Sequence, residues 1–189
     1  MVNKRYPHDL DQVVRFHGHF CRGILIGYRA AKIGLEHLGK PRAVDEEIIA
    51  IVENDSCAVD AVQVLTGCTF GKGNLFFRDH GKHVYTFAVR PSGRAVRVSS
   101  KPGRRLPLDQ MLAAPAGDLF WIEPTTIELP APAALRDSVL CSRCGEPVMA
   151  TRTRRRGDRL LCIPCAARGG AHGARPPVRN RPGRPPAHA

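Results

Sequence analysis

Long apolar runs are missing from this sequence. No stretch of its 189 residues approaches the roughly 20 consecutive apolar residues that a membrane-spanning helix needs. The first residues, MVNKRYPHDLDQVV, also lack the apolar segment of a secretory signal peptide. We therefore expect a soluble, cytoplasmic protein with no membrane partner. Because thiols stay reduced in the cytoplasm, the seven cysteines are expected to serve metal or thiol chemistry rather than disulfides.

Negative charge is scarce in the C-terminal part of the sequence. Residues 141–189 hold eleven arginines and two acidic residues, whereas residues 1–140 hold 18 basic and 15 acidic residues. The net charge of +12 therefore belongs mainly to the C-terminal part. Such an asymmetry favours nucleic acid or another polyanion as a partner, but it does not indicate the chemistry of the rest of the chain.

The composition is that of a folded protein without internal repeats. With 43% hydrophobic and 24% charged residues, the chain has enough apolar side chains for a real core. Its length suits one ordinary domain plus a small module. We expect a core domain at residues 1–129, a linker at 130–140 that begins with PAPAA, a four-cysteine zinc finger at 141–166, and a disordered Arg/Pro-rich tail at 167–189.

Helical periodicity predicts the helices of the core domain. Residues 20–38 repeat apolar side chains at helical spacing before a Gly-Lys-Pro stop, and a second helix is expected from near Cys57 to a cap at Gly67. A short third helix is expected at residues 108–113. The first helix contains three glycines, which either let another backbone approach closely or are simply tolerated. They are Gly23, Gly27 and Gly34.

Apolar and β-branched runs between turn signals predict the strands. They lie at residues 47–53, 74–79, 82–90, 94–100 and 119–123. The second to fourth of these runs are separated by short turn signals and are expected to form a meander. The sequence therefore predicts an α+β fold with a mixed, largely antiparallel sheet packed against helices, plus a small C-terminal zinc module.

Two Cys-x-x-Cys pairs predict a structural zinc site in that module. A tetrahedral zinc ion needs four soft donors about 2.3 Å away, and each pair brings two thiolates to one side of the ion. The segment between the pairs contains a Gly157-Asp158 turn and is expected to form a hairpin. Redox-active cysteine pairs are the alternative. The expected zinc ligands are Cys141, Cys144, Cys162 and Cys165.

A denser cluster of metal-capable side chains occurs near the N-terminus. His17, His19 and Cys21 lie at alternate positions, which places them on one face if the segment is extended, whereas in a helix only His17 and Cys21 share a face. Imidazole and thiolate together suit zinc, nickel, iron or copper, so these three residues are candidates for a second transition-metal site. Core histidines beside a buried cysteine are the alternative interpretation.

Two further cysteines are candidate reactive residues. Cys57 is expected at a helix N-terminus, which would stabilise its thiolate, and Asp60 lies one turn later, where it could bind the metal or orient a histidine. Cys68 lies in a Gly-rich loop that lacks the P-loop pattern. Cys57, Cys68 and Asp60 are therefore the candidate catalytic residues.

These segments resemble a known family. FHGHFCRG, ENDSCAVDAVQVLTGCTFGKGNL and RDHGK are similar to signature stretches of FmdE, a family of formylmethanofuran dehydrogenase subunits, and CSRCGEP with LLCIPCA resembles its C-terminal DksA/TraR-like treble-clef zinc finger. The resemblance covers residues from about 10 to 166. It implies an α+β core, often a homodimer, with a metal-binding or reactive cleft lined by the cysteine, histidine and aspartate positions named above.

The resemblance also implies a functional link to molybdenum or tungsten formylmethanofuran dehydrogenase, whose other subunits would then be partners. That enzyme reduces carbon dioxide to a formyl group in methanogenesis and related C1 pathways. An accessory, metal-binding subunit of this oxidoreductase is the first hypothesis. Two alternatives remain: a nucleic-acid-binding or transcription-associated protein that uses the zinc finger and the Arg-rich tail, and a cysteine-based redox enzyme.

Overall fold

The computed structural model describes residues 6–103 and 106–167. The chain divides into two compact units between Ala133 and Ala134. Apart from Ala167, the tail expected to be disordered lies outside the described residues. Within the described residues, no helix is both long enough and apolar enough to cross a membrane.

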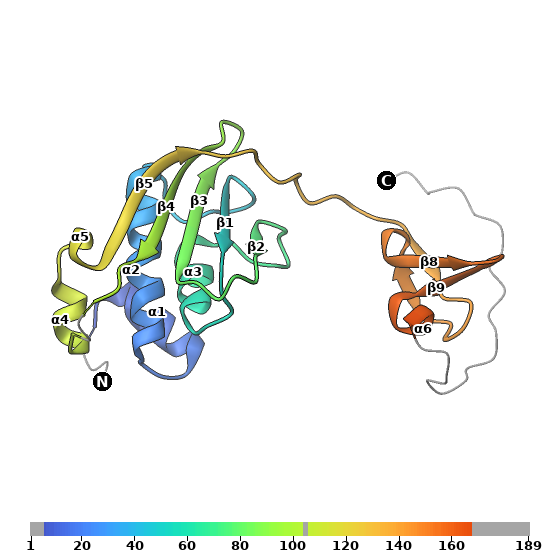
Figure 1. The fold of residues 1–189 in the computed structure, drawn as a ribbon, viewed down its shortest axis with the longest axis horizontal. Helices are drawn as coiled ribbons and strands as arrows, with labels where there is room; N and C mark the ends of the chain where they lie inside the picture. The colour runs from blue at the N-terminus through green and yellow to red at the C-terminus, as the bar shows by residue number, and fades with distance from the viewer. Residues whose placement is uncertain (1–5, 104–105, 168–189) are drawn as a thin grey trace. The chain divides into compact units, whose positions relative to one another are not determined.

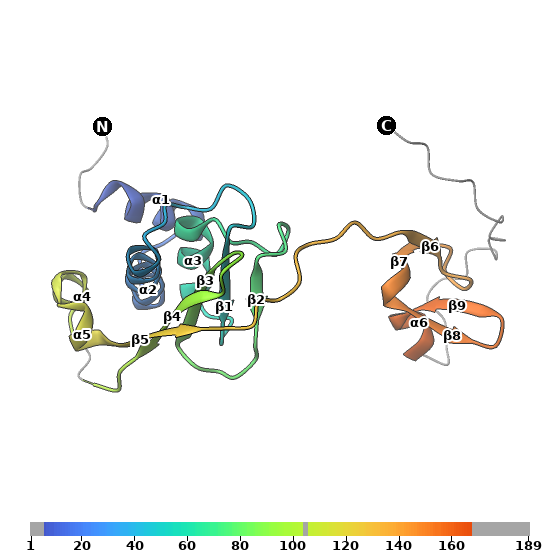
Figure 2. The same cartoon turned by 90° about the horizontal axis from the view of Figure 1, so that it is seen from above.

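The first unit is a five-stranded sheet with its main helices on one face (Figures 1 and 2). The strand order is β2-β1-β3-β4-β5. The strands are β1 (Ile48–Val52), β2 (Leu75–Phe77), β3 (Val84–Val89), β4 (Arg94–Ser100) and β5 (Phe120–Thr126). The helices are α1 (His8–His17), α2 (Arg22–Leu38), α3 (Ala58–Thr66), α4 (Leu108–Ala113) and α5 (Ala116–Leu119). This arrangement confirms the expected α+β class.

Strand β1 is buried along its whole length because both faces of the sheet are covered there. Ile48, Ala50 and Val52 join the main core beneath the helices. Ile49 and Ile51 belong to a smaller cluster on the opposite face, which also includes Ala88 and Ala95. Alternation along the strand therefore sends apolar side chains into two separate cores, which explains the continuous apolar run in the sequence.

The predicted meander is only partly correct. Strands β3, β4 and β5 pair antiparallel in sequence order. Strand β2, however, lies on the far side of β1 and pairs parallel with it, with Ala50 opposite Leu75. The chain leaves β1, passes through α3 and returns in the same direction, and such a helical crossover is the usual connection between parallel strands.

Helix α1 is an element that the sequence analysis did not predict. It follows Pro7, carries Asp9 and Asp11 in its first turn, and ends at Gly18, which adopts the left-handed conformation with φ of 97°. Proline before a helix, acidic residues in its first turn and a left-handed glycine after it all favour these boundaries. Helix α1 thereby presents its last residue, His17, at the turn into α2.

The glycines of α2 are used for close packing inside this chain. An added Cβ at Gly27 would collide with the backbone of Ala58, and one at Gly34 would collide with the ring of Phe87. The expectation of a close approach is therefore confirmed, and the neighbours are α3 and β3. Because residues of the same chain already fill the space beside these glycines, the glycines do not support a contact with a second copy of the protein.

The second unit is a small module built around the four cysteines. Its elements are β6 (Ser138–Leu140), β7 (Pro147–Met149), the short 3-10 helix η1 (Ala150–Arg152), β8 (Thr153–Arg156), β9 (Arg159–Cys162) and α6 (Ile163–Ala167). Strands β6 and β7 form one antiparallel pair, and β8 and β9 form the expected hairpin. Strand β6 begins within the segment expected to be linker.

Candidate metal centres

Three side chains from three different helix ends meet in the first unit. A ring nitrogen of His17, Sγ of Cys21 and Sγ of Cys57 all lie within 4.8 Å of one another. His17 is the last residue of α1, while Cys21 and Cys57 are the N-cap residues of α2 and α3. We call these three residues the core cluster. The spacing is that of groups able to share one metal ion.

The turn between α1 and α2 places His17 and Cys21 together. Gly18 ends α1, and Cys21 has an extended backbone and accepts a hydrogen bond from the Ile24 N–H at 3.4 Å through its sulfur. The HGHFC segment is therefore neither a continuous strand nor a helix, the two geometries considered from the sequence. A left-handed glycine followed by an N-cap cysteine brings the two side chains together instead.

Cys57 is held by a polar turn and by a glycine. The Asn54 side-chain oxygen accepts hydrogen bonds from Ser56 N–H at 3.1 Å and Ser56 hydroxyl at 2.7 Å, and its amide donates to the carbonyl of Lys82 at 2.6 Å. Across the interface, an added Cβ at Gly23 would lie 2.9 Å from Cβ of Cys57. Asn54, Ser56 and Gly23 thus fix where Cys57 meets α2.

His17 has one nitrogen engaged and one left over. Its Nδ1 lies 2.8 Å from Oδ2 of Asp60, and the side chain is only 13% exposed. Its Nε2 is buried and, among the described residues, has no hydrogen-bond partner. A buried imidazole nitrogen without a partner is costly unless something else binds it, and a metal ion is the ligand that imidazole and thiol neighbours suit. The donor set therefore fits a transition-metal ion.

The environment of Cys57 differs from the expected one. Burial, and then the neighbouring Cys21 thiol, raise the pKa of Cys57 above its usual value. The helix N-terminus was expected to have the opposite effect and to hold Cys57 as a free thiolate. Two adjacent thiols oppose one another's ionisation, and a bound cation would remove that opposition.

The structure separates the remaining candidates from the core cluster. His19 is exposed and stacks against His17, with ring centroids 4.6 Å apart, but it is not one of the converging groups. Cys68 is fully buried, and its thiol donates to the carbonyl of Ile48 at 3.4 Å. Burial raises the pKa of Cys68 to about 11, so this residue is a core side chain rather than a reactive thiolate. Asp60 takes the orienting role, through its contact with His17.

Sequence reasoning missed the residues that position Cys57. Asn54 and Ser56 lie between the predicted strand at residues 47–53 and the helix expected from near Cys57, and neither residue is assigned a role in the sequence analysis. The pattern Asn-x-Ser just before a helix start could have identified them, because these side chains commonly bond the backbone two residues further on. Here Ser56 hydroxyl also accepts from the N–H of Ala58 at 3.4 Å, at the first turn of α3.

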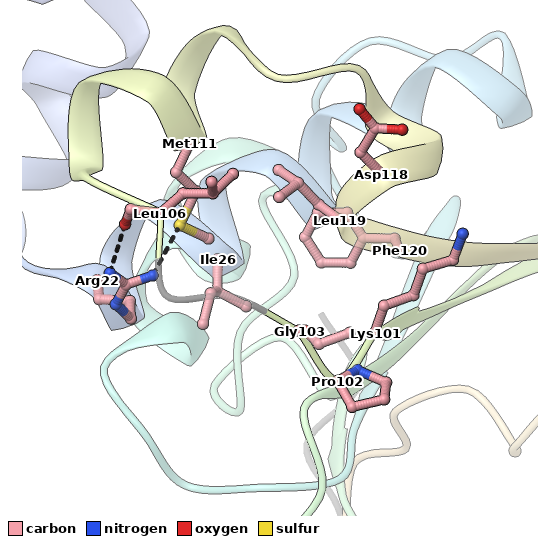
Figure 3. A pocket seen from close by; sticks show the side chains of 11 residues that line it. Arg22, Ile26, Lys101, Pro102, Gly103, Leu106, Met111, Asp118, Leu119 and Phe120 are labelled. Atoms are coloured by element: carbon pink, nitrogen blue, oxygen red, sulfur yellow. Dashed lines mark hydrogen bonds between the residues drawn. The ribbon is translucent and has the colours of Figure 1, made fainter.

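A cavity of about 380 Å³ lies beside the start of α2. Figure 3 shows Arg22 pointing from this helix toward Leu106 and Met111; it donates to the carbonyl of Leu106 at 2.6 Å and to Sδ of Met111 at 3.6 Å. Lys101, which also lines the cavity, donates to the carbonyl of Gly117. The positively charged side chains of Arg22 and Lys101 are thus both engaged by other residues of the chain. The main role of Arg22 is to tie the segment before α4 to α2, which begins directly after Cys21.

The second unit brings its four cysteines together in the way a zinc site requires. All four Sγ atoms lie within 4.8 Å of one another and all four residues are buried. Sγ of Cys144 and Sγ of Cys162 are 3.9 Å apart, close to the roughly 3.8 Å edge of a tetrahedron with 2.3 Å zinc–sulfur bonds. The first pair forms a knuckle closed by Gly145, while Cys162 ends β9 and Cys165 lies in α6.

Hydrogen bonding in the knuckle favours at least one thiolate. Burial opposes ionisation of Cys141, but backbone N–H groups from Cys144 and Cys162 outweigh it and lower the pKa of Cys141 to about 6. The backbone N–H of Cys162 donates to Sγ of Cys141 at 3.3 Å. For Cys165, the neighbouring side chain of Cys162, and then burial, raise the pKa to about 12. A dication among the four sulfurs would offset this resistance to further ionisation.

Comparison with known proteins agrees with this geometry. The family described as "FmdE, Molybdenum formylmethanofuran dehydrogenase operon" matches residues 16–116, and the prokaryotic dksA/traR C4-type zinc finger matches residues 136–168. The crystal structure of a tungsten formylmethanofuran dehydrogenase FmdE-like protein from Syntrophus aciditrophicus is similar, with a TM-score of 0.65 and 25% identity. The similarity covers 83% of this chain and 89% of that one.

A curated relative is longer than this chain. A probable S-adenosyl-L-methionine-binding protein of Archaeoglobus fulgidus is 31% identical over an alignment that covers 80% of this chain and 50% of the relative. The chain thus spans about half the length of that relative. The FmdE match includes all three residues of the core cluster, and the zinc-finger match includes all four cysteines of the second unit. This chain therefore belongs to the FmdE family and carries a zinc finger of the dksA/traR type at residues 136–168.

Proposed function

We propose that this protein binds a transition-metal ion at His17, Cys21 and Cys57, in addition to the structural zinc of the finger. One observation carries the proposal. Nε2 of His17 is buried without a hydrogen-bond partner among the described residues, while a ring nitrogen of the same residue and two thiols lie within 4.8 Å of one another. Without an ion, this arrangement leaves a buried polar atom unsatisfied.

Three protein ligands would leave a coordination position open. Closed four-ligand sites serve structure, whereas sites with three protein ligands keep a place for water, substrate or an exchanging donor. Asp60 would act on the metal through His17, because its hydrogen bond to Nδ1 fixes the ring orientation and leaves Nε2 for the ion. The proposed core site therefore suits metal exchange or chemistry at the ion.

The family gives the proposal its biological setting. We propose that the core site serves metal handling or assembly for molybdenum or tungsten formylmethanofuran dehydrogenase in cytoplasmic C1 metabolism, with subunits of that enzyme as partners. The description of the matching family and the similarity to the Syntrophus protein support this link. A homodimer is part of the same proposal and rests on the family resemblance, since the glycines of α2 are used within the chain.

A cysteine-based redox role is the second candidate, because Cys21 and Cys57 are neighbours. Their sulfur atoms lie within 4.8 Å of each other, and the Cys21 thiol adds to burial in raising the pKa of Cys57. If these thiols served as a redox couple instead of metal ligands, thiol titration would detect a disulfide in the aerobically purified protein and the core would hold no ion.

The deciding experiment counts metal ions in protein purified without chelator. Wild type should carry a core ion in addition to the finger zinc, and His17→Ala should lose the core ion only. His19→Ala is the matched control, because it removes a neighbouring imidazole that is exposed and outside the cluster. A wild type with finger zinc alone, or a His17→Ala protein with unchanged metal content, would refute the core site.

Asp60→Asn supplies a graded version of the same test. Loss of an orienting carboxylate commonly weakens metal binding about 10- to 100-fold without removing a ligand. We expect the core ion to be lost at correspondingly lower chelator concentration, while finger zinc is retained. Equal affinities in Asp60→Asn and wild type would mean that the contact between Asp60 and His17 is structural only.

A further inference from the structure

We propose that the β8–β9 hairpin of the zinc finger binds the phosphate backbone of a nucleic acid through Arg154, Arg156 and Arg159. We call these three residues the arginine face. This inference is independent of the core cluster and of any role in C1 metabolism. It concerns a surface of the second unit that the structural zinc does not use.

The register of the hairpin places the three side chains on one face. Arg156 lies directly opposite Arg159, on either side of the Gly157-Asp158 turn. Arg154 is two residues before Arg156 on the same strand, so it points to the same side, roughly 7 Å along. All three are exposed, and none forms an ion pair with another residue in the described ranges 6–103 and 106–167. Arg154 donates a single hydrogen bond, to the carbonyl of Thr153.

Placing like charges directly opposite one another works against the hairpin. Cross-strand pairs of the same sign are destabilising, and this one closes a two-stranded sheet with little apolar support. Charged residues do protect exposed strand edges from aggregation, but alternating signs would do so without the repulsion. A polyanion bound at this face would attract each of the three arginines, and this attraction would offset the repulsion between them. Binding of a polyanion therefore accounts for three arginines on one face.

A hollow beside the hairpin borders two of the three arginines, Arg154 and Arg156. A hollow of about 260 Å³ lies between β8 and α6, lined by residues 154–156 of β8 and by Ile163, Ala166 and Ala167 of α6. The ribbon in Figure 2 shows α6 beside the hairpin, in agreement with their contacts. Ile163 is 43% exposed, which offers an apolar surface next to the charges. Guanidinium groups bind phosphate oxygens in a bidentate manner, and a row of three suits a polymer with repeated phosphates better than a single anion.

The test measures binding of the full, zinc-loaded chain to a mixed-sequence single-stranded oligonucleotide over a range of salt concentrations. Each phosphate contact adds about 0.7 to the slope of log affinity against log salt for single strands, so Arg154→Gln/Arg156→Gln/Arg159→Gln should lower the slope by about 2. The control Lys40→Gln/Arg78→Gln/Lys82→Gln removes the same charge from exposed positions of the first unit. Its slope should remain that of wild type.

Both variants retain residues 168–189, so the arginines of that segment cannot account for a difference between them. Zinc content, measured in parallel, shows whether the finger is still folded in the triple arginine variant. Equal loss of binding in both variants would mean that total charge, and not the arginine face, governs affinity. Unchanged binding in the arginine variant, or equally tight binding of polyglutamate by wild type, would overturn the assignment to nucleic acid.

Discussion

The four cysteines of the finger come from one short stretch, residues 141–165, whereas the three residues of the core cluster come from the ends of three helices between residues 17 and 57. The four finger cysteines are all buried, and few apolar side chains are buried with them: among the residues that the structure describes, the hydrophobic side chains packed against them are those of Val148 and Leu161, both only partly buried. The core cluster lies at the margin of a large apolar core that includes Tyr85, Phe87 and Phe120.

The two clusters therefore differ in what holds their side chains in place. In the finger, almost no apolar surface is available to offset the entropy of ordering the chain, so metal binding has to supply most of the folding free energy. In the first unit, packing of α2 and α3 on the sheet places Cys21 and Cys57 whether or not an ion is bound. An ion bound at the core cluster, as we propose, would therefore be exchangeable without unfolding of the first unit.

Breaking the finger site should give the largest effect. Cys162→Ser removes one of four thiolates, and zinc contributes about 10–16 kcal/mol to the folding of comparable modules. We expect loss of the finger zinc and of amide-exchange protection in β8 and β9, with the thermal unfolding of the first unit unchanged. A variant with full zinc content and equally protected hairpin amides would show that the four-cysteine assignment is wrong.

An intermediate effect is expected at the contact between α2 and α3. Gly27→Ala forces a methyl group against the backbone of Ala58, and overpacking of this kind costs about 1–3 kcal/mol. Because Cys57 precedes Ala58, the displacement of α3 should also weaken the core site, with finger zinc unaffected. Denaturant unfolding and metal counting measure the two effects.

Gly117→Ala is the matched control for this substitution. A Cβ at Gly117 meets no atom within 4 Å, so this variant should be as stable as wild type or slightly more stable, since alanine favours helix. If Gly27→Ala unfolds at the same denaturant concentration as Gly117→Ala, the close approach of the two helices does not control the geometry of the core cluster.

Local signals in the sequence were sufficient for most elements and for the finger. The apolar run of β1, the helical spacing of α2 and the left-handed glycine after α3 are local features, and they placed these elements within a few residues. The two Cys-x-x-Cys pairs identified the zinc site for the same reason, since both halves of the site are short local motifs.

Features that depend on distant residues were not predictable in this way. The parallel position of β2 is set by the route of the chain through α3, which no local pattern of residues 74–79 reveals. Cys57 and Cys68 are both candidate reactive residues in the sequence, but tertiary packing places Cys57 beside Cys21 and buries Cys68 against Ile48. Likewise, local sequence does not reveal that Asp60, on a different helix, engages Nδ1 of His17 and leaves Nε2 without a partner among the described residues.

The smallest effect is expected where α1 is tied to α2. Asp9 accepts hydrogen bonds from Tyr28 hydroxyl at 3.0 Å and from Lys32 Nζ at 2.8 Å. Burial alone would raise the pKa of Asp9, but these partners outweigh it and hold the pKa below its usual value. A carboxyl with a lower pKa in the folded than in the unfolded chain stabilises the fold at neutral pH, and this contribution is lost as the pH falls through the folded value.

Asp9→Asn should therefore lower the stability of the first unit at neutral pH by less than about 1 kcal/mol, because the pair with Lys32 is partly exposed. The difference from wild type should shrink as the pH falls through the folded-state pKa of Asp9, which lies below the usual value for an aspartate. Asp11→Asn is the control: it removes the same charge from α1, but its partner Arg15 lies on the same helix, so the contact with α2 is kept. Denaturant unfolding at several pH values measures both variants. A pH-independent deficit in Asp9→Asn, or an equal one in Asp11→Asn, would mean that the ionised carboxylate does not hold α1, and with it His17, against α2.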